Sequence, residues 1–365
     1  MNVTNTSGGK VGWVSGPDTR STAGLLWSCL STIFICTWTA FHMNVPARSD
    51  SRLMLLGRKF EYMCFAILAP ELVALCAAEE RCTARNCQKE LGIITGREDK
   101  GSVSSTYAFF IVMGGFEGLS SDGYHFRFTH EGFLDTLRDG AIALPDLPNK
   151  DIRDRSKADG LLKAVACAQI IWLAAQTIGR AIQGLTITTL ELFPVAIVGC
   201  TIITYGFWWA KPMDVMCPVL IPVDRTLDEL RVINKLRPIE QRVGIFDIRY
   251  EGNRALYAGL ISIAIIGACH LCAWNFEFAS VTEGLLWRVS SVGCVTLPTM
   301  ALLLLLLFSN KSTWRGSTYN RVIWPCLSLY MLVRGYLIVE IFVALRSVPA
   351  DAYQDVDWSR YFPHI

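Results

Sequence analysis

Residues 23–42 read AGLLWSCLSTIFICTWTAFH and contain no Asp, Glu, Lys or Arg. A run of about 20 apolar residues is the length of helix that crosses the hydrocarbon core of a bilayer. The preceding residues 1–22 are polar and rich in glycine, and they lack the apolar region of a cleavable signal peptide. This stretch therefore predicts a first transmembrane helix that also serves as an uncleaved signal anchor.

The same kind of apolar block recurs along the chain. Five further blocks are long enough to cross a bilayer, at residues 161–182, 187–209, 255–274, 289–308 and 322–345. Residues 61–78 form a weaker block, because it carries two glutamates and Pro70; a short span, a re-entrant helix and an interfacial helix are the alternatives there. We expect an all-α, polytopic transmembrane helix bundle with about seven spans and two polar loop regions.

The composition fits this prediction and excludes other classes. Of 365 residues, 52% are hydrophobic and 18% are charged, against about 45–50% and 25% in soluble domains. The net charge of +2 gives no reason to expect a nucleic-acid partner. Most of the 13 cysteines lie in apolar blocks, where a thiol packs as a small hydrophobic group, so no disulfide framework is expected.

The expected organisation alternates membrane and polar segments. A polar N-terminal tail (1–22) precedes spans one and two (23–78), and a C-terminal tail (346–365) follows spans five to seven (254–345). The parts between them are a polar loop domain (79–160), the hairpin of spans three and four (161–209) and a second polar region (210–253). We expect 79–160 to fold, because a structureless loop of that length is uncommon, and residues 227–237, LDELRVINKLR, to form one amphipathic helix.

The expected topology contains a conflict. The loop after the first block carries Arg48, Arg52, Arg58 and Lys59, which by the positive-inside rule places it in the cytosol and the N-terminus outside. The loop after the sixth block is also basic, yet seven spans would place it outside. Three glycosylation sequons fall on the outer side in a seven-span arrangement and support the first orientation; they begin at Asn2, Asn5 and Asn310.

Ionisable residues inside apolar blocks are the candidate functional residues, because a charge in hydrocarbon costs at least about 2.5–3.5 kcal/mol. The candidate catalytic residues chosen on this basis are Glu71, Glu191, Arg334 and Glu340. Arg334 and Glu340 are six positions apart and point to different helix faces. Arg334 therefore needs a carboxylate on another helix, for which Glu61, Glu71 and Glu191 are the candidates.

A second pair lies at a predicted helical hairpin. Counting the weak block, Arg180 lies late in the third block and Glu191 lies early in the fourth. The connection between the two blocks is too short for anything but adjacent helices. We expect both side chains at the same membrane face. A structural ion pair that fixes the hairpin is the favoured interpretation, and a polar pocket is the alternative.

Other motifs are weak. Cys269 and Cys272 flank His270 in C-x-x-C spacing, but a zinc site needs four ligands and no second pair follows. His125 and His130 lie in an aromatic-rich loop that reads equally well without a metal. No nucleophile elbow, phosphate-binding loop or dinucleotide fingerprint is present, so neither a cofactor nor a metal is expected. Lys211 after two tryptophans reads as an interfacial anchor, with lipid head-group binding as the alternative.

Six segments together resemble a large, poorly characterised family of multi-pass membrane proteins from filamentous fungi. They are residues 27–46 (WSCLSTIFICTWTAFHMNVP), 108–116 (AFFIVMGGF), 187–192 (ITTLEL), 205–215 (YGFWWAKPMDV), 270–278 (HLCAWNFEF) and 351–365 (DAYQDVDWSRYFPHI). Tyr107 stands where the family pattern has histidine. The resemblance implies a fungal source, an endoplasmic-reticulum or plasma-membrane address, and, through gene neighbourhoods of some members, a link to secondary metabolism.

Two functional hypotheses follow. The first is a membrane-embedded enzyme that acts on a lipid-soluble metabolite of isoprenoid or meroterpenoid type by acid-catalysed cyclisation or isomerisation, using a buried carboxylate. The alternative is a non-catalytic membrane scaffold, sensor or lipid-binding protein, which the two polar regions favour. In either case the expected partners are membrane lipids and a lipid-soluble small molecule, with no nucleic acid.

Overall fold

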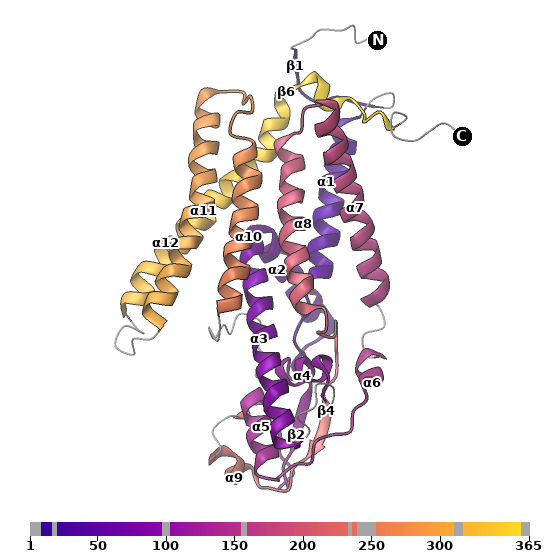
Figure 1. The fold of residues 1–365 in the computed structure, drawn as a ribbon, viewed down its shortest axis with the longest axis vertical. Helices are drawn as coiled ribbons and strands as arrows, with labels where there is room; N and C mark the ends of the chain where they lie inside the picture. Colours follow the sequence, from indigo (N-terminus) through magenta and orange to yellow (C-terminus); the bar gives the residue numbers. More distant parts are fainter. Residues whose placement is uncertain are drawn as a thin grey trace, which may run out of the picture.

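The computed structural model describes residues 9–16, 20–96, 103–154, 159–232, 236–238, 253–309 and 317–358. The fold is mostly helical, with 68% of the described residues in helices. Long helices form an upright bundle, and a smaller domain with short helices and strands lies below one end of it (Figure 1). The predicted helical class is therefore correct for most of the chain.

In the described part of the chain, six helices are long and apolar enough to cross a membrane. They are α1 (Thr22–Ala40), α7 (Asp159–Gln183), α8 (Thr189–Trp208), α10 (Asn253–Cys272), α11 (Val281–Ser309) and α12 (Ser317–Val343). Each contains one of the six strong apolar blocks of the sequence. The seventh, weaker block has a different structure.

The weak block lies across a sharp bend between α2 (Arg52–Leu68) and α3 (Pro70–Ile94), whose axes differ by 112°. Pro70 causes the break: it has no N–H to donate, and its ring disfavours a helical conformation at Ala69. Ala69 accordingly has φ −140° and ψ 63°. The weak block is therefore not one straight span, and α3 continues 16 residues beyond the predicted boundary at residue 78.

One end of the bundle carries both ends of the described chain, and the other end carries the small domain. At the end called here the termini end, β1 (Lys10–Val11) pairs antiparallel with β6 (Val348–Pro349), so that the start and the end of the described chain lie together (Figure 1). The opposite, sheet end carries the small domain. The α1 and α8 helices both run from the termini end to the sheet end, where the rings of Phe41 and Trp208 lie 6.0 Å apart.

The bent pair enters the bundle from the sheet end and returns to it. Just before α2, Arg48 pairs with Glu117 of the small domain. Midway along α2, Lys59 pairs with Asp214, which follows α8, at 2.8 Å. Near the end of α3, Leu91 packs in the core of the small domain. The bend itself lies inside the bundle, where Tyr330 of α12 donates to the Leu68 carbonyl. The α2–α3 pair is thus a helical hairpin with both open ends at the sheet end.

The two polar regions fold into one domain. Its four-stranded sheet has the order β4-β2-β3-β5, formed by β2 (Phe116–Leu119), β3 (His125–Phe128), β4 (Val219–Pro222) and β5 (Leu236–Arg237). Four short helices accompany it: α4 (Ser105–Val112), α5 (His130–Arg138), α6 (Asn149–Asp154) and α9 (Leu227–Val232). This sheet is absent from the all-α prediction. The helix predicted over 227–237 ends at Val232, because Leu236 and Arg237 pair with β3 instead.

Candidate functional site

Four polar or ionisable side chains meet inside the bundle, where α2 ends and α3 begins. Glu71 comes from α3, His270 from α10, and Tyr330 and Arg334 from α12. All four are buried, Arg334 completely so at 0% exposure. We call these four residues the polar centre. Sequence analysis singled out Glu71 and Arg334, and the structure brings them to one place.

Arg334 makes three kinds of contact in this centre. Its Nη1 lies 2.5 Å from Nε2 of His270, and its Nη2 donates to the Ile67 carbonyl at 3.5 Å. Its guanidinium lies over the ring of Phe193 on α8, 5.1 Å from the ring centroid. A planar, permanently charged group with several donors suits such a mixed environment.

The break between α2 and α3 explains why charges are stabilised at this depth. The last carbonyls of α2 have no partners within the helix, and Arg334 and the Tyr330 hydroxyl donate to those of Ile67 and Leu68. A cation is favourable at a helix C-terminus and an anion at a helix N-terminus. Arg334 occupies the first position, and Glu71, in the first turn of α3, occupies the second.

Glu71 is the carboxylate that faces Arg334. The two charges interact electrostatically, and the Tyr330 hydroxyl lies beside the same carboxylate. Within the described part of the chain, Glu71 Oε2 and Arg334 Nε have no hydrogen-bond partner, and Arg334 forms no ion pair with a carboxylate within 4.0 Å. The direct carboxylate partner predicted for Arg334 is thus replaced by His270, with Glu71 next to it.

The other carboxylates singled out in the sequence lie away from Arg334. Glu61 is exposed on α2. Glu340 is buried near the termini end, where its neighbours are Tyr336, Glu283 and Arg346. Glu340 therefore does not belong to the polar centre, as the different helix faces of Arg334 and Glu340 predicted.

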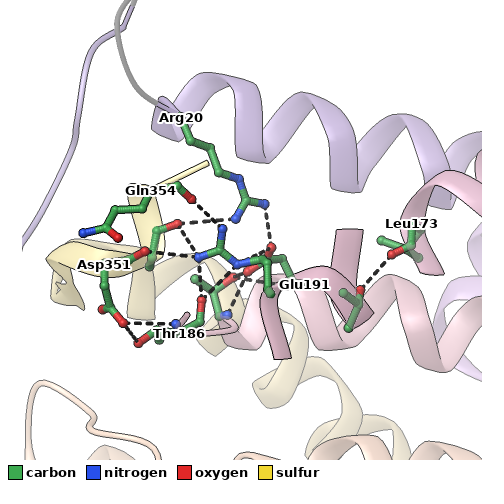
Figure 2. Close-up of polar contacts among 10 residues, drawn as sticks. Arg20, Leu173, Thr186, Glu191, Asp351 and Gln354 are labelled. Atoms are coloured by element: carbon green, nitrogen blue, oxygen red, sulfur yellow. Dashed lines mark hydrogen bonds and ion pairs between the residues drawn. The ribbon is translucent and has the colours of Figure 1, made fainter. Parts of the chain in front are cut away.

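Glu191 lies at the termini end in a second cluster (Figure 2). Its Oε1 is 3.7 Å from Nε of Arg180 and 2.5 Å from Nη2 of Arg20. Its Oε2 accepts from the backbone N–H and hydroxyl of Thr188, which completes a capping box at the start of α8. Arg180 and Glu191 lie at the same face, as predicted. The expected side-by-side packing of α7 and α8 is not what the structure shows, because both helices pack mainly against α1 and only little against each other.

Arg180 holds the C-terminal segment on the bundle. Its guanidinium, buried to 0% exposure, donates to the carbonyls of Thr186, Asp351, Ala352 and Gln354 (Figure 2). The Asp351 carboxylate in turn accepts from the N–H and hydroxyl of Thr186. These contacts favour the structural interpretation of Arg180 and Glu191. The part played by Arg20, in the polar N-terminal tail, could not be predicted from hydropathy.

No metal site is supported by the described residues, which contain no group of three or more His, Cys, Asp or Glu side chains in ligand geometry. His270 of the C-x-x-C motif faces Arg334 instead. His125 lies beside the buried Glu117, which also pairs with Arg48. His270 was noted in the sequence only as part of the C-x-x-C motif, and its spacing from Arg334 gave no signal of their contact.

Lys211 is buried rather than interfacial. Its Nζ pairs with Glu80 Oε2 at 2.6 Å and lies 4.6 Å from the ring centroid of Trp208. Trp208 Nε1 donates to the same carboxylate oxygen at 2.7 Å. Burial lowers the pKa of the Lys211 ammonium, and the neighbouring Glu80 carboxylate opposes part of that effect. With 1% side-chain exposure, Lys211 does not reach a lipid head group.

Residues 2–252 and 308–365 match a protein family described as "Family of unknown function (DUF8562)". The chain belongs to the DUF8562 family. The matched residues include Glu71, Tyr330 and Arg334, whereas His270 lies in the stretch between the two matched parts. No curated protein and no solved structure matches the chain significantly.

Proposed function

We propose that the protein is an integral membrane protein that crosses the bilayer with six helices and inserts the α2–α3 hairpin as a re-entrant element. The support is the set of six apolar helices and a bent pair whose ends return to the same side. Backbone that leaves the helical state within a membrane is tolerated where protein partners satisfy it. Arg334 and Tyr330 do this at the bend.

A six-span arrangement removes the topological conflict. The basic loop with Arg48, Arg52 and Arg58 and the start of α12 with Arg321 both lie at the sheet end, whereas the short α7–α8 and α10–α11 connections at the termini end contain no Lys or Arg. The positive-inside rule then places the sheet end in the cytosol and both termini outside. An address in the endoplasmic reticulum or plasma membrane agrees with this orientation.

The sequons divide differently in this arrangement. Asn2, Asn5 and Asn310 lie outside the described residues, but Gly9 lies at the termini end and Ser309 at the sheet end. In the proposed six-span arrangement, the three sequons would not all lie on one side. We expect glycosylation at Asn2 or Asn5 and none at Asn310.

Membrane insertion and topology can be tested in one expression experiment. The protein should remain in the pellet after carbonate washing and dissolve only in detergent. Glycosidase treatment should shift its mobility in the wild type and in Asn310→Gln, and should have no effect in a double Asn2→Gln and Asn5→Gln variant. Recovery in the soluble fraction, or a shift that depends on Asn310, would contradict the arrangement.

For the activity, we propose an acid–base site at the polar centre of a membrane-embedded enzyme whose substrate is a lipid-soluble metabolite of isoprenoid or meroterpenoid type. The observation that carries this proposal is a buried Glu71 carboxylate with an unpartnered oxygen beside His270, Tyr330 and Arg334. A general acid needs a proton-bearing group next to the reacting atom in a site that excludes water. Glu71, ionised beside Arg334 before the reaction, would accept a proton from one position of the substrate and donate it to another, and Arg334 and Tyr330 would position the carboxyl group.

The test compares Glu71→Gln with Glu61→Gln, a change of the same size and charge at an exposed site on α2. Both variants would replace the native protein in its source organism, and lipid-soluble metabolites would be profiled by mass spectrometry. We expect a metabolite to disappear and its precursor to accumulate in Glu71→Gln alone, at equal protein levels. In a third strain the native protein is removed altogether. If the metabolite profile of that strain is unchanged, the result would instead favour the non-catalytic scaffold or lipid-binding role.

A further inference from the structure

A pocket opens at the termini end, close to the contacts around Arg180. It has a volume of about 450 Å³ and lies between the α7–α8 connection, the α10–α11 connection and the segment after α12. Its apolar lining includes Leu185, Ile187, Phe276, Phe278 and Val348. This volume is within the range of small-molecule sites, about 300–1,000 Å³.

Two of the hydroxyl groups in the lining are bonded to carboxylates outside it. The hydroxyl of Thr186 donates to Asp351 at 2.6 Å, and that of Thr188 donates to Glu191 at 2.9 Å. Glu277 is the one charged residue among the described lining residues, and it is exposed and paired with Lys10 at 3.2 Å. Thr189, Asn275 and Ser347 add uncharged polar groups to a lining that is mostly apolar. The pocket therefore offers a charged ligand no counter-charge in its interior, and such a ligand would lose its hydration there without compensation.

Aromatic rings connect this pocket to the polar centre. Phe278 lines the pocket, and its ring centroid lies 5.5 Å from that of the buried Trp287. Trp287 in turn lies edge-on to His270 at 5.6 Å and donates its indole N–H to the His270 carbonyl. His270 contacts Arg334. Two aromatic side chains thus separate the pocket from the polar centre.

We propose that this pocket binds the apolar part of a neutral, membrane-soluble small molecule, and that Trp287 forms the partition between the bound molecule and the polar centre. The second statement rests on the proposed function of the polar centre, whereas the first does not. The pocket opens at the end of the bundle, where an apolar molecule can enter from the outer part of the bilayer.

Photolabelling of the full-length protein in phosphatidylcholine vesicles tests the first statement. The probe is a long-chain alcohol that carries a diazirine, and the labelled peptides are mapped by mass spectrometry. We expect label on residues 275–278 and 344–349, removed by excess unlabelled alcohol and retained with the corresponding long-chain carboxylate. Label spread evenly over exposed apolar residues of α12, or label that excess alcohol does not remove, would overturn the proposal.

Two tryptophan substitutions provide a matched pair for the same assay. Ala344 lines the pocket, so Ala344→Trp fills it and should lower the pocket label by at least about tenfold. Gly335→Trp adds the same side chain to α12 where an added Cβ meets open space, and it should leave the label unchanged. Equal labelling of both variants would overturn the assignment, and competition in the wild type decides the matter if Ala344→Trp does not fold.

The partition has its own experiment. In Trp287→Ala the label should extend to the peptide that contains His270, whereas Trp287→Phe should keep the wild-type pattern. If the labelling pattern is identical in both variants, Trp287 does not form the partition, but the assignment of the pocket as a binding site is unaffected. If the pocket is labelled but Glu71→Gln leaves all metabolites unchanged, the proposed activity fails and the binding site remains.

Discussion

Nη1 of Arg334 lies 2.5 Å from Nε2 of His270, deep in the bundle and 64 positions away in sequence. A guanidinium can only donate, so Nε2 must present a lone pair, and the imidazole is neutral with its proton on Nδ1. A neutral histidine can accept from Arg334 without adding a second positive charge. Glu71 is then the one carboxylate of the polar centre that balances the charge of Arg334.

The first prediction concerns Arg334 itself. Arg334→Leu removes the donor to the Ile67 carbonyl and leaves Glu71 without its counter-charge. Removing one partner of a buried charged pair costs about 3–5 kcal/mol. We expect a large fall in the thermal stability of the detergent-solubilised protein. Arg321→Leu, at an exposed position on the same helix, should leave the stability near that of the wild type.

A double variant separates electrostatics from packing in this pair. If Glu71 and Arg334 stabilise one another, Arg334→Leu combined with Glu71→Gln should cost less than the sum of the two single changes. Strict additivity would mean that the two charges are independent, and the electrostatic account of the α2–α3 break would fail.

The second prediction concerns the C-terminal segment. Arg180 donates to carbonyls of Asp351, Ala352 and Gln354, so Arg180→Leu should release this segment from the bundle. The expected result is faster amide hydrogen exchange and protease cleavage around residues 350–357, with little change in α10 and α11. Arg231→Leu, which removes an exposed arginine paired with Asp228, is the control. Slow exchange in Arg180→Leu would show that other contacts suffice.

Hydropathy predicted much of the helical framework. The six strong blocks correspond to six long helices because an apolar run of that length in a helix buries its own backbone hydrogen bonds. The meeting of Arg180 and Glu191 was also predictable, because a short connection places the end of one helix near the start of the next. These properties depend on residues that are close in sequence, so they can be predicted from local sequence patterns. The packing of α1 against both helices was not predictable in this way.

The bend and the sheet needed information that is distant in sequence. Pro70 marked a break, but the choice between a short span and a returning hairpin depends on Tyr330 and Arg334, which satisfy the exposed carbonyls from another helix. The pairing of β2 with β4 joins residues about a hundred positions apart. Each strand has at most four residues, too few for an alternating pattern to be distinguished.

The third prediction compares two glycines, one tightly packed in the small domain and one in open space on α2. A Cβ at Gly115 would lie 2.5 Å from the Phe110 carbonyl oxygen, so Gly115→Ala forces the backbone before β2 to move. Such overpacking costs about 1–3 kcal/mol. Gly57 lies inside α2 with open space around it, and Gly57→Ala should stabilise the helix by about 0.5–1 kcal/mol. Thermal unfolding of both variants should shift in opposite directions; a shift in the same direction would contradict the packing described here.

The last prediction concerns the buried pair of Lys211 and Glu80. Glu80 also accepts from Trp208 and Asn44, so Lys211→Met leaves a buried carboxylate with two neutral donors and no cation. We expect this change to cost about 3–5 kcal/mol, and Glu80→Gln added to it to recover part of the loss.

The pH dependence of Glu80→Gln provides an independent measurement of the same interaction. Burial already lowers the pKa of Lys211 from its ordinary value of 10.5, and the Glu80 carboxylate opposes that effect. Without the carboxylate the folded-state pKa should fall further. Between the folded and unfolded values the unfolded state binds more protons, so stability rises with pH in that interval. The melting temperature of Glu80→Gln should therefore increase from neutral pH toward pH 10.5 more steeply than that of the wild type. A parallel pH profile for the two proteins would show that Glu80 does not support the charge of Lys211.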